Sequence, residues 1–123
     1  MLVTLPIRLV NPLNRREHWA VRSKRNQEHR AIARMALTSR RDWRPEARPV
    51  HVTLTRISPR PFDGHDNAPA AFKSLVDGIA DALGLSSDRA DGVSWSYAWR
   101  RGPPKTHKVE ILIEEEPTRP GAV

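Results

Sequence analysis

The sequence has no cysteine, which excludes disulfide bonds and thiolate metal sites and is typical of proteins from a reducing compartment. Long apolar runs are also missing, and none approaches the length of about 20 residues that a membrane-spanning helix needs. The opening MLVTLPIRLV lacks the basic and then apolar layout of a signal peptide, and no internal repeat is visible. We therefore expect a cytoplasmic protein that does not bind membranes.

The composition is that of a globular protein. Of the 123 residues, 38% are apolar and 28% are charged, a balance that argues against a disordered chain. The length suffices for one modest core and not for two. We expect a single domain over residues 1–116, followed by a frayed, proline-bearing tail at residues 117–123.

Positive charge is concentrated in the first half of the chain. Residues 1–60 carry 14 Lys and Arg against 4 Asp and Glu, a net charge of +10, whereas residues 61–123 carry 7 against 10, a net charge of −3. Thirteen of the 14 cations in the first half are arginine, whose planar guanidinium suits phosphate groups and base edges. Together with a sequence pI near 11.0, this asymmetry favours nucleic acid as the partner over a basic surface that only aids solubility.

Four segments alternate apolar with polar residues, as half-buried strands do. These segments cover residues 3–9, 50–55, 93–100 and 108–115. Pro6 predicts an edge or bulged position for the first segment, because proline cannot donate a hydrogen bond to a neighbouring strand. The turn sequence RGPPKTH between the last two segments predicts that they pair as a hairpin.

Two further segments have the periodicity of helices. In the first, from about Ser23 to Ser39, the apolar positions at helical spacing are Ile32, Met35 and Ala36. In the second, from about Pro69 to Leu83, the apolar stripe comprises Phe72, Leu75, Val76, Ile79 and Leu83. The order β-α-β-α-β-β indicates the α/β (α+β) class, with a small mixed sheet of about four strands and two main helices.

The ends of the second helix carry clear signals. Asp66 or Asn67 can cap its start, Pro69 fits its first turn, and Gly84 can close it. Gly78 is a weak point within it, since glycine costs about 1 kcal/mol relative to alanine in a helix.

Three loop aspartates border this second helix: Asp63 and Asp66 precede it, and Asp88 follows it. Loop carboxylates are good ligands for Mg²⁺, which retains several waters and needs few protein carboxylates. A metal bound in this way can activate water for attack on a phosphodiester. His65 and Lys73 are then candidates for proton transfer or for stabilising charge on the phosphate. The combination indicates a phosphodiester hydrolase.

Structural roles account for the same residues. Asp66 can be only a helix cap, worth about 1 kcal/mol, and Asp63 can belong to an ordinary Asp-Gly turn. Lys73 can pair with Asp77 four residues further along the helix. His65 can be an ordinary loop histidine.

The stretch DGHDNAPAAFKSLVDGIADALG, followed by an Asp-bearing loop and a valine-led strand, resembles the RusA-type family of Holliday-junction resolvases. The family pattern is Asp-x-Asp-Asn, a lysine, an apolar helix and an Asp-Asp loop. The opening LPIRLVNPLNRREHW is similar to the family's first strand and turn, so the resemblance covers most of residues 2–115. Two spacings depart from the pattern: Asp63 stands three residues before Asp66 rather than two, and Lys73 stands six residues after Asn67 rather than three.

The resemblance implies a homodimeric endonuclease that depends on Mg²⁺, or on Mn²⁺ in its place, and nicks four-way DNA junctions symmetrically. It further implies a phage or prophage origin, action at the bacterial nucleoid and no small-molecule cofactor. Carried over residue by residue, Asp66 and Lys73 match the second aspartate and the helix lysine of the pattern. Asp63 most nearly matches the first aspartate, and Asp88 matches the loop aspartate. Asp63, Asp66 and Asp88 are thus the expected metal ligands.

Contacts with DNA are expected from the basic segment around the first helix. The residues that we place against the DNA backbone are Asn14, Arg15, Arg16, Arg22, Lys24, Arg25 and Arg34. Trp19, in the same arginine-rich stretch, is a candidate for stacking on bases or wedging them apart. For Trp95 and Trp99 we favour core packing or a dimer interface, with base stacking as the alternative.

The expected metal ligands stand at both ends of the second helix, which would be about 24 Å long for about 16 residues. Metal ligands must converge to within a few Å. Either the loop at residues 86–92 folds back along the helix or a second subunit completes the site, and we favour a helix that packs antiparallel against its dimer mate. The rival function is a non-catalytic basic nucleic-acid-binding module, in which the acidic residues only cap and solvate.

Overall fold

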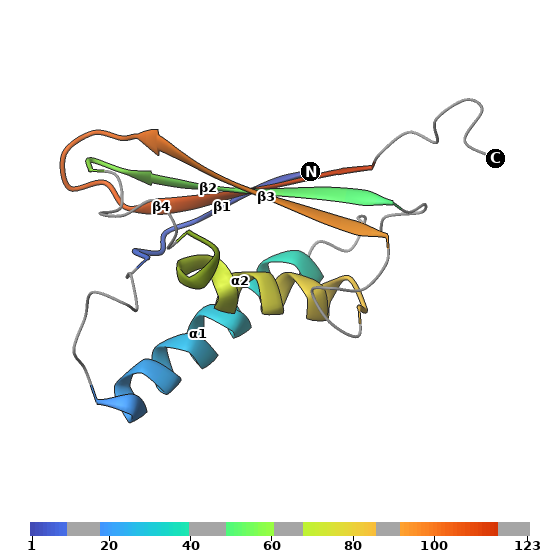
Figure 1. The fold of residues 1–123 in the computed structure, drawn as a ribbon, viewed down its shortest axis with the longest axis horizontal. Helices are drawn as coiled ribbons and strands as arrows, with labels where there is room; N and C mark the ends of the chain where they lie inside the picture. Colours follow the sequence, from blue (N-terminus) through green and yellow to red (C-terminus); the bar gives the residue numbers. More distant parts are fainter. Residues whose placement is uncertain (10–17, 40–48, 61–67, 86–91, 116–123) are drawn as a thin grey trace.

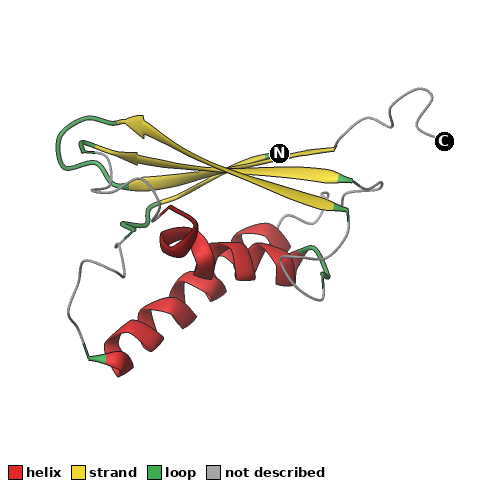
Figure 2. Cartoon of the chain, in the orientation of Figure 1, coloured by secondary structure: helices red, strands yellow, loops and turns green. Residues whose placement is uncertain are grey.

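The computed structural model describes residues 1–9, 18–39, 49–60, 68–85 and 92–115 of the chain. They form two layers, a twisted four-stranded sheet with two helices on one face (Figure 1, Figure 2). The elements in chain order are β1 (Leu2–Leu5), α1 (Trp19–Thr38), β2 (Val50–Ser58), α2 (Ala68–Ala82), β3 (Val93–Arg101) and β4 (Lys108–Glu115). The predicted α+β class and the element order are confirmed. The expected frayed tail lies outside the described residues.

The strand order in the sheet is β1-β4-β2-β3. β2 and β3 run parallel, whereas β4 is antiparallel to both β1 and β2, so the sheet is mixed as predicted. β1 is an edge strand and ends at Leu5, directly before Pro6, which agrees with the restriction that proline places on strand pairing.

The predicted hairpin between the last two strands is wrong, because β2 lies between β3 and β4. The helix α2 connects β2 to β3, and such a crossover lets these two strands pair in parallel. The chain then passes around the end of β2 to reach β4 on its other side (Figure 1). A hydrogen bond of 3.0 Å from the backbone N–H of Gly102 to the carbonyl of Ser58 ties the start of this connection to β2.

The core lies between the helices and the side of the sheet that faces them. Alternate residues of β2 (Val50, Val52 and Leu54) and two of β4 (Val109 and Ile111) are completely buried there. The predicted stripe of α2 packs onto these strands: Phe72, Leu75, Val76 and Ile79 are at most 1% exposed, and Leu83 is 7% exposed. This part of the fold follows directly from the periods of about 3.6 and 2 in the sequence.

The C-terminal end of α2 has the hydrogen bonding of a Schellman motif. Gly84 adopts a positive φ of 71°, its N–H donates to the carbonyl of Asp81, and the N–H of Leu85 donates to the carbonyl of Ala80. The predicted closure at Gly84 is confirmed. The predicted caps at the other end, Asp66 and Asn67, lie outside the described residues.

The helix α1 differs from its prediction in two respects. It begins at Trp19 rather than Ser23, because the Nδ1 atom of His18 accepts a hydrogen bond of 3.2 Å from the N–H of Ala20 and caps the first turn. Its buried residues are Ala33 and Leu37, whereas Ile32 and Met35 are 41% and 67% exposed. The expected apolar face was therefore wrong for Ile32 and Met35, whereas Ala36 does pack against the core. α1 packs mainly on α2, through a seam of small residues.

Gly78 explains why the two helices come so close. A Cβ atom at this position would lie 2.3 Å from the carbonyl oxygen of Arg30 and 3.0 Å from the Cβ of Ala33. No side chain fits there, so the glycine that looks like a weak point of α2 is the contact that admits α1.

Candidate nucleic-acid interface

The structure describes some of the predicted site residues and not others. Outside the described residues lie all the predicted metal ligands together with His65 and three DNA contacts: Asp63, Asp66, Asp88, Asn14, Arg15 and Arg16. The predicted residues that the structure places are Trp19, Arg22, Lys24, Arg25 and Arg34 on α1, and Lys73 on α2. The geometry of the site is therefore built from the two helices.

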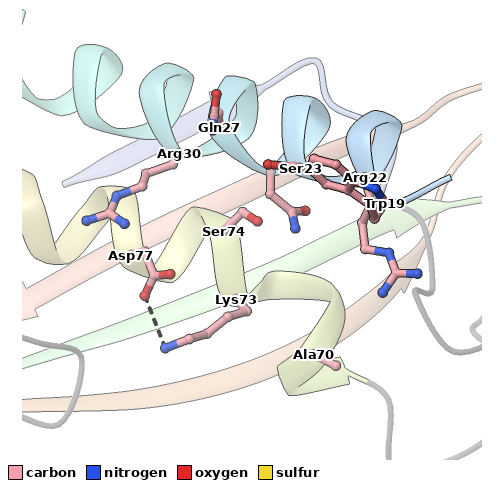
Figure 3. A pocket seen from close by; sticks show the side chains of 10 residues that line it. Trp19, Arg22, Ser23, Gln27, Arg30, Ala70, Lys73, Ser74 and Asp77 are labelled. Carbon is pink, nitrogen blue, oxygen red and sulfur yellow. Dashed lines mark ion pairs between the residues drawn. The ribbon is translucent and has the colours of Figure 1, made fainter.

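A pocket of about 500 Å³ lies between the first turns of α1 and the first turns of α2. Trp19 and Arg22 line it from α1, and Ala70 and Lys73 line it from α2 (Figure 3). The guanidinium of Arg22 reaches from α1 toward the start of α2 (Figure 3). The pocket thus brings Lys73 of α2 together with Trp19 and Arg22 of α1, although the two helices are far apart in the sequence.

Lys73 forms the ion pair with Asp77 that the sequence offered as an alternative to a catalytic role. Its Nζ lies 3.1 Å from Oδ1 of Asp77, and both residues line the pocket. The two side chains are 54% and 28% exposed, so water screens the pair and its contribution to stability is small. The ammonium group stays accessible to an anion in the pocket, and Asp77 holds it at the rim.

Arg30, another residue of the pocket wall, forms a bidentate ion pair with Asp81 of α2. Its Nε and Nη2 atoms donate to the two carboxylate oxygens at 2.7 and 2.9 Å. These hydrogen bonds, followed by the nearby positive charges of Arg30 and Arg34, lower the pKa of Asp81. The pair crosses the helix–helix seam beside the pocket; its side chains are 52% and 30% exposed, so its contribution to stability is small.

The remaining predicted DNA contacts of α1 do not share one face with Arg22. Lys24 is exposed but stands two residues further on, about 200° around the helix axis. Arg25 is half-buried, and burial followed by the charge of Arg25 lowers the pKa of His29. Arg34 lines a second groove further along α1, beside Asp81. Of the predicted set on α1, only Trp19 and Arg22 line the pocket at the start of α2.

Among the described residues, no group of three or more His, Asp or Glu side chains is placed to bind a metal ion. The predicted ligands belong to residues 61–67, between β2 and α2, and to residues 86–91, between α2 and β3. These two segments join opposite ends of α2. The helix has 15 residues, so its ends lie about 22 Å apart.

The two tryptophans of β3 have different environments. Trp95 packs against the core, as favoured from the sequence. Trp99 is 36% exposed, and its Nε1 donates a hydrogen bond of 3.0 Å to the hydroxyl of Ser58. The guanidinium carbon of Arg101 lies 5.8 Å from the centre of the Trp99 ring. Core packing of Trp99 was therefore an incorrect expectation, whereas its other favoured role, at a dimer interface, stays a prediction.

A basic group near Trp99 was missed by sequence reasoning. Burial, followed by the charge of Arg8, lowers the pKa of Arg56. Burial, followed by the charges of Arg8 and Arg56, lowers the pKa of His107. A signal was present in the sequence, because Arg56 continues the alternation of Val50, Val52 and Leu54 and so falls on the helix-facing side of the sheet.

Comparison with known proteins adds no family assignment. Neither the models of known protein families nor the sequences of curated proteins match this chain. In the described part of the chain, neither helix combines the length and the apolar character that a membrane crossing requires. The function is therefore argued from the site alone.

Proposed function

We propose that the protein is a homodimeric, metal-dependent endonuclease that nicks four-way DNA junctions during recombination and repair. The observation that supports this most is the pocket at the start of α2. It joins Trp19 and Arg22 of the basic helix to Lys73, next to the point where the acidic segment FDGHDN enters α2. The segment with the carboxylates that would carry out hydrolysis thus directly precedes, in the sequence, the helix that supplies Lys73 to the pocket.

The described residues of the pocket bind and orient the DNA strand. Arg22 contacts a phosphate through its planar guanidinium, and Lys73 contacts the phosphate that is cleaved. Lys73 stabilises the negative charge that develops on this phosphate as the bond breaks. Asp77, at 3.1 Å from the lysine Nζ, orients the ammonium group until DNA arrives.

Asp63, Asp66 and Asp88 are the residues that would hold the metal, because three carboxylates form a hard oxygen donor set that fits Mg²⁺ or Mn²⁺. The bound ion would supply an activated water and neutralise charge on the phosphate. His65 would accept a proton from the attacking water or donate one to the leaving oxygen of the phosphate. Asp66 stands two residues before Ala68, so two peptide units of about 3.8 Å each keep it within reach of the pocket.

A second subunit completes the site in this proposal. The segment with Asp63 and Asp66 joins one end of α2 and the segment with Asp88 joins the other, about 22 Å away. An antiparallel arrangement of two α2 helices brings unlike ends together. A two-fold dimer also matches the approximate two-fold symmetry of a four-way junction, in which two strands are cut. The protein would act at the nucleoid in the cytoplasm of a bacterial cell.

A non-catalytic nucleic-acid-binding module is the second candidate. The observation in its favour is the ion pair of Lys73 with Asp77, which gives the helix lysine a structural role. In this case the pocket still binds the DNA backbone, and the aspartates only cap α2 and solvate the loops.

The decisive experiment is a cleavage assay on a synthetic four-way junction, the matched duplex and a single strand, with Mg²⁺ or EDTA. We expect paired nicks near the crossover that require Mg²⁺ and are absent from duplex. Asp66→Asn should abolish cleavage and leave junction affinity unchanged or higher, because one repulsive charge is lost.

The matched control is Glu114→Gln, which removes an exposed carboxylate from β4, a strand that does not line the pocket, and should keep both activities. Tight binding of the junction by the wild-type protein without any Mg²⁺-dependent nick would refute the enzyme and leave the binding module.

A further inference from the structure

A second basic and aromatic surface lies where the parallel strands β2 and β3 end. In the register of the sheet Arg56 stands beside Trp99, and Ser58 stands beside Arg101. Because side chains alternate along a strand, all four lie on the same side as the core residues Leu54 and Tyr97. We call this surface the carboxyl-edge cluster; it comprises Trp99, Arg101, Arg56, Ser58, Arg8 and His107.

The ring of Trp99 is held in a fixed orientation. Its Nε1 donates to the hydroxyl of Ser58 at 3.0 Å, and this hydroxyl donates to the carbonyl of Arg60 at 2.7 Å. Ser58 is 1% exposed, so the two hydrogen bonds are shielded from water. Trp99 is nonetheless 36% exposed, and Arg101 lies 5.8 Å from its ring centre. A partly exposed, pre-oriented indole beside a guanidinium is suited to receive a flat aromatic group.

Positive charge surrounds this ring. Arg56 is on the neighbouring strand, about 4.8 Å from the backbone of Trp99. Burial lowers the pKa of both Arg56 and His107; the positive charge of Arg8 adds to this effect at each, and that of Arg56 adds to it at His107. On the opposite face of the sheet the charge of Arg100 is balanced by Glu110, whose Oε1 is 2.6 Å from its Nη2. The helix-facing side thus combines the aromatic platform of Trp99 with the cations Arg56 and Arg101.

We infer that the carboxyl-edge cluster binds one unpaired nucleotide of DNA, with the base stacked on Trp99 and its phosphate bound by Arg56 and Arg8. The carboxyl ends of parallel strands are a common place for ligands in sheets of this kind. The choice of DNA rests on the proposed function, in which the unpaired nucleotide comes from the crossover of the junction. Ser58 acts as a positioning residue, because it holds the indole and does not touch the nucleotide.

The test measures the affinity of the full chain for a labelled thymidine oligonucleotide by fluorescence anisotropy. A second oligonucleotide of equal length has abasic sites in place of the bases. Trp99→Leu should weaken binding of the thymidine oligonucleotide by about 5- to 150-fold, the range that stacking of one base spans. The same variant should leave the abasic oligonucleotide unaffected, and Trp99→Phe should retain most of the affinity because it keeps a ring.

Arg8→Gln is the matched comparison, since Arg8 contacts phosphate in this arrangement and not the base. This variant should weaken the binding of both oligonucleotides equally, and it should reduce the slope of log affinity against log salt concentration by about 1. Ser58→Ala keeps the indole ring but removes its hydrogen bond. The affinity of this variant for the thymidine oligonucleotide should lie between those of wild type and Trp99→Leu. Equal affinity of wild type and Trp99→Leu for the thymidine oligonucleotide, or an equal loss with the abasic one, would overturn the inference.

The outcome is separable from that of the cleavage assay. A protein that cuts junctions and binds thymidine without any effect of Trp99 keeps the proposed function and loses this inference. A protein that cuts nothing but discriminates thymidine from abasic sites through Trp99 keeps this inference as a DNA-binding site and loses the nuclease.

Discussion

The two helices of this protein have opposite relations to its core. Within its 15 residues α2 buries five apolar side chains, whereas α1 has 20 residues and buries only Ala33 and Leu37 among them. The first turns of α1 lie far from the sheet, and Trp19 is 73% exposed there (Figure 1). α2 therefore serves mainly to form the core, whereas α1 serves mainly to present charged side chains.

This separation explains where the basic residues can be used. A helix buried along one side has few positions for arginine, because burying a charge without a partner is costly. By packing on α2 through a narrow seam, α1 keeps most of its circumference exposed. The one constraint is the seam itself, which must hold α1 in position for its cations to meet those of α2.

The two helices should differ most in how much the free energy of unfolding falls when one side chain on each is truncated. Leu75→Ala, in the fully buried stripe of α2, should lower the free energy of unfolding by about 2–5 kcal/mol. Met35→Ala, at a position of α1 that is 67% exposed, should change it by less than about 0.5 kcal/mol. Urea unfolding of both variants measures this. Similar losses for the two would mean that α1 is buried in solution, for example by a partner.

The seam is tested by Gly78→Ala. Alanine gains about 1 kcal/mol of helix propensity, but its Cβ would lie 2.3 Å from the carbonyl oxygen of Arg30. Since a backbone atom cannot rotate away, α1 must move, and we expect a net loss of about 1–3 kcal/mol.

The same change combined with Ala33→Gly checks the reason for that loss. Removal of the Ala33 side chain should not restore stability, because the obstacle is the backbone of α1. Thermal unfolding that shows full rescue in the double variant would instead identify side-chain crowding as the cause.

The smallest effect is expected for the ion pair across the seam. Arg30→Gln and Asp81→Asn should each cost about 0.5–1 kcal/mol at neutral pH, and a double-mutant cycle should give a coupling of similar size, since the pair is partly exposed. The ion pair lowers the pKa of Asp81 below its ordinary value of 3.8 in the folded state. The unfolded chain therefore binds more protons as the pH falls, and the stabilisation is present above about pH 4 and lost on acidification. A coupling energy that persists in 1 M salt would contradict the expectation that the charges of this exposed pair are screened.

Periodicity in the sequence was sufficient for the elements that bury a regular face. The stripe of α2, its Schellman end at Gly84 and the alternation of β2 all follow from local rules. Strand pairing did not follow, because the turn sequence before β4 is compatible with either neighbour, and only the crossover through α2 decides that β2 takes the central place. The face of α1 was also not predictable, because its position depends on a close approach at Gly78 of the other helix.

For the candidate site, sequence reasoning identified Trp19, Arg22 and Lys73, which the structure brings to one pocket. It did not separate these from Lys24, Arg25 and Arg34, since charge alone does not tell which side of α1 meets α2. The carboxyl-edge cluster escaped notice because its members are spread from Arg8 to His107, and the register that sets Arg56 beside Trp99 is not visible in the sequence. Asp63, Asp66 and Asp88 lie outside the described residues, so their role stays a prediction.

The position of β4 has a consequence for how the protein forms during synthesis. β4 is the last strand of the described chain, yet it lies between β1 and β2 and pairs with both. While the ribosome makes the chain, β1 has no strand to pair with until residues 108–115 have emerged, and β2 has a parallel partner at best. The sheet therefore closes only after residues 108–115 are available, which favours slow folding governed by contacts between distant segments.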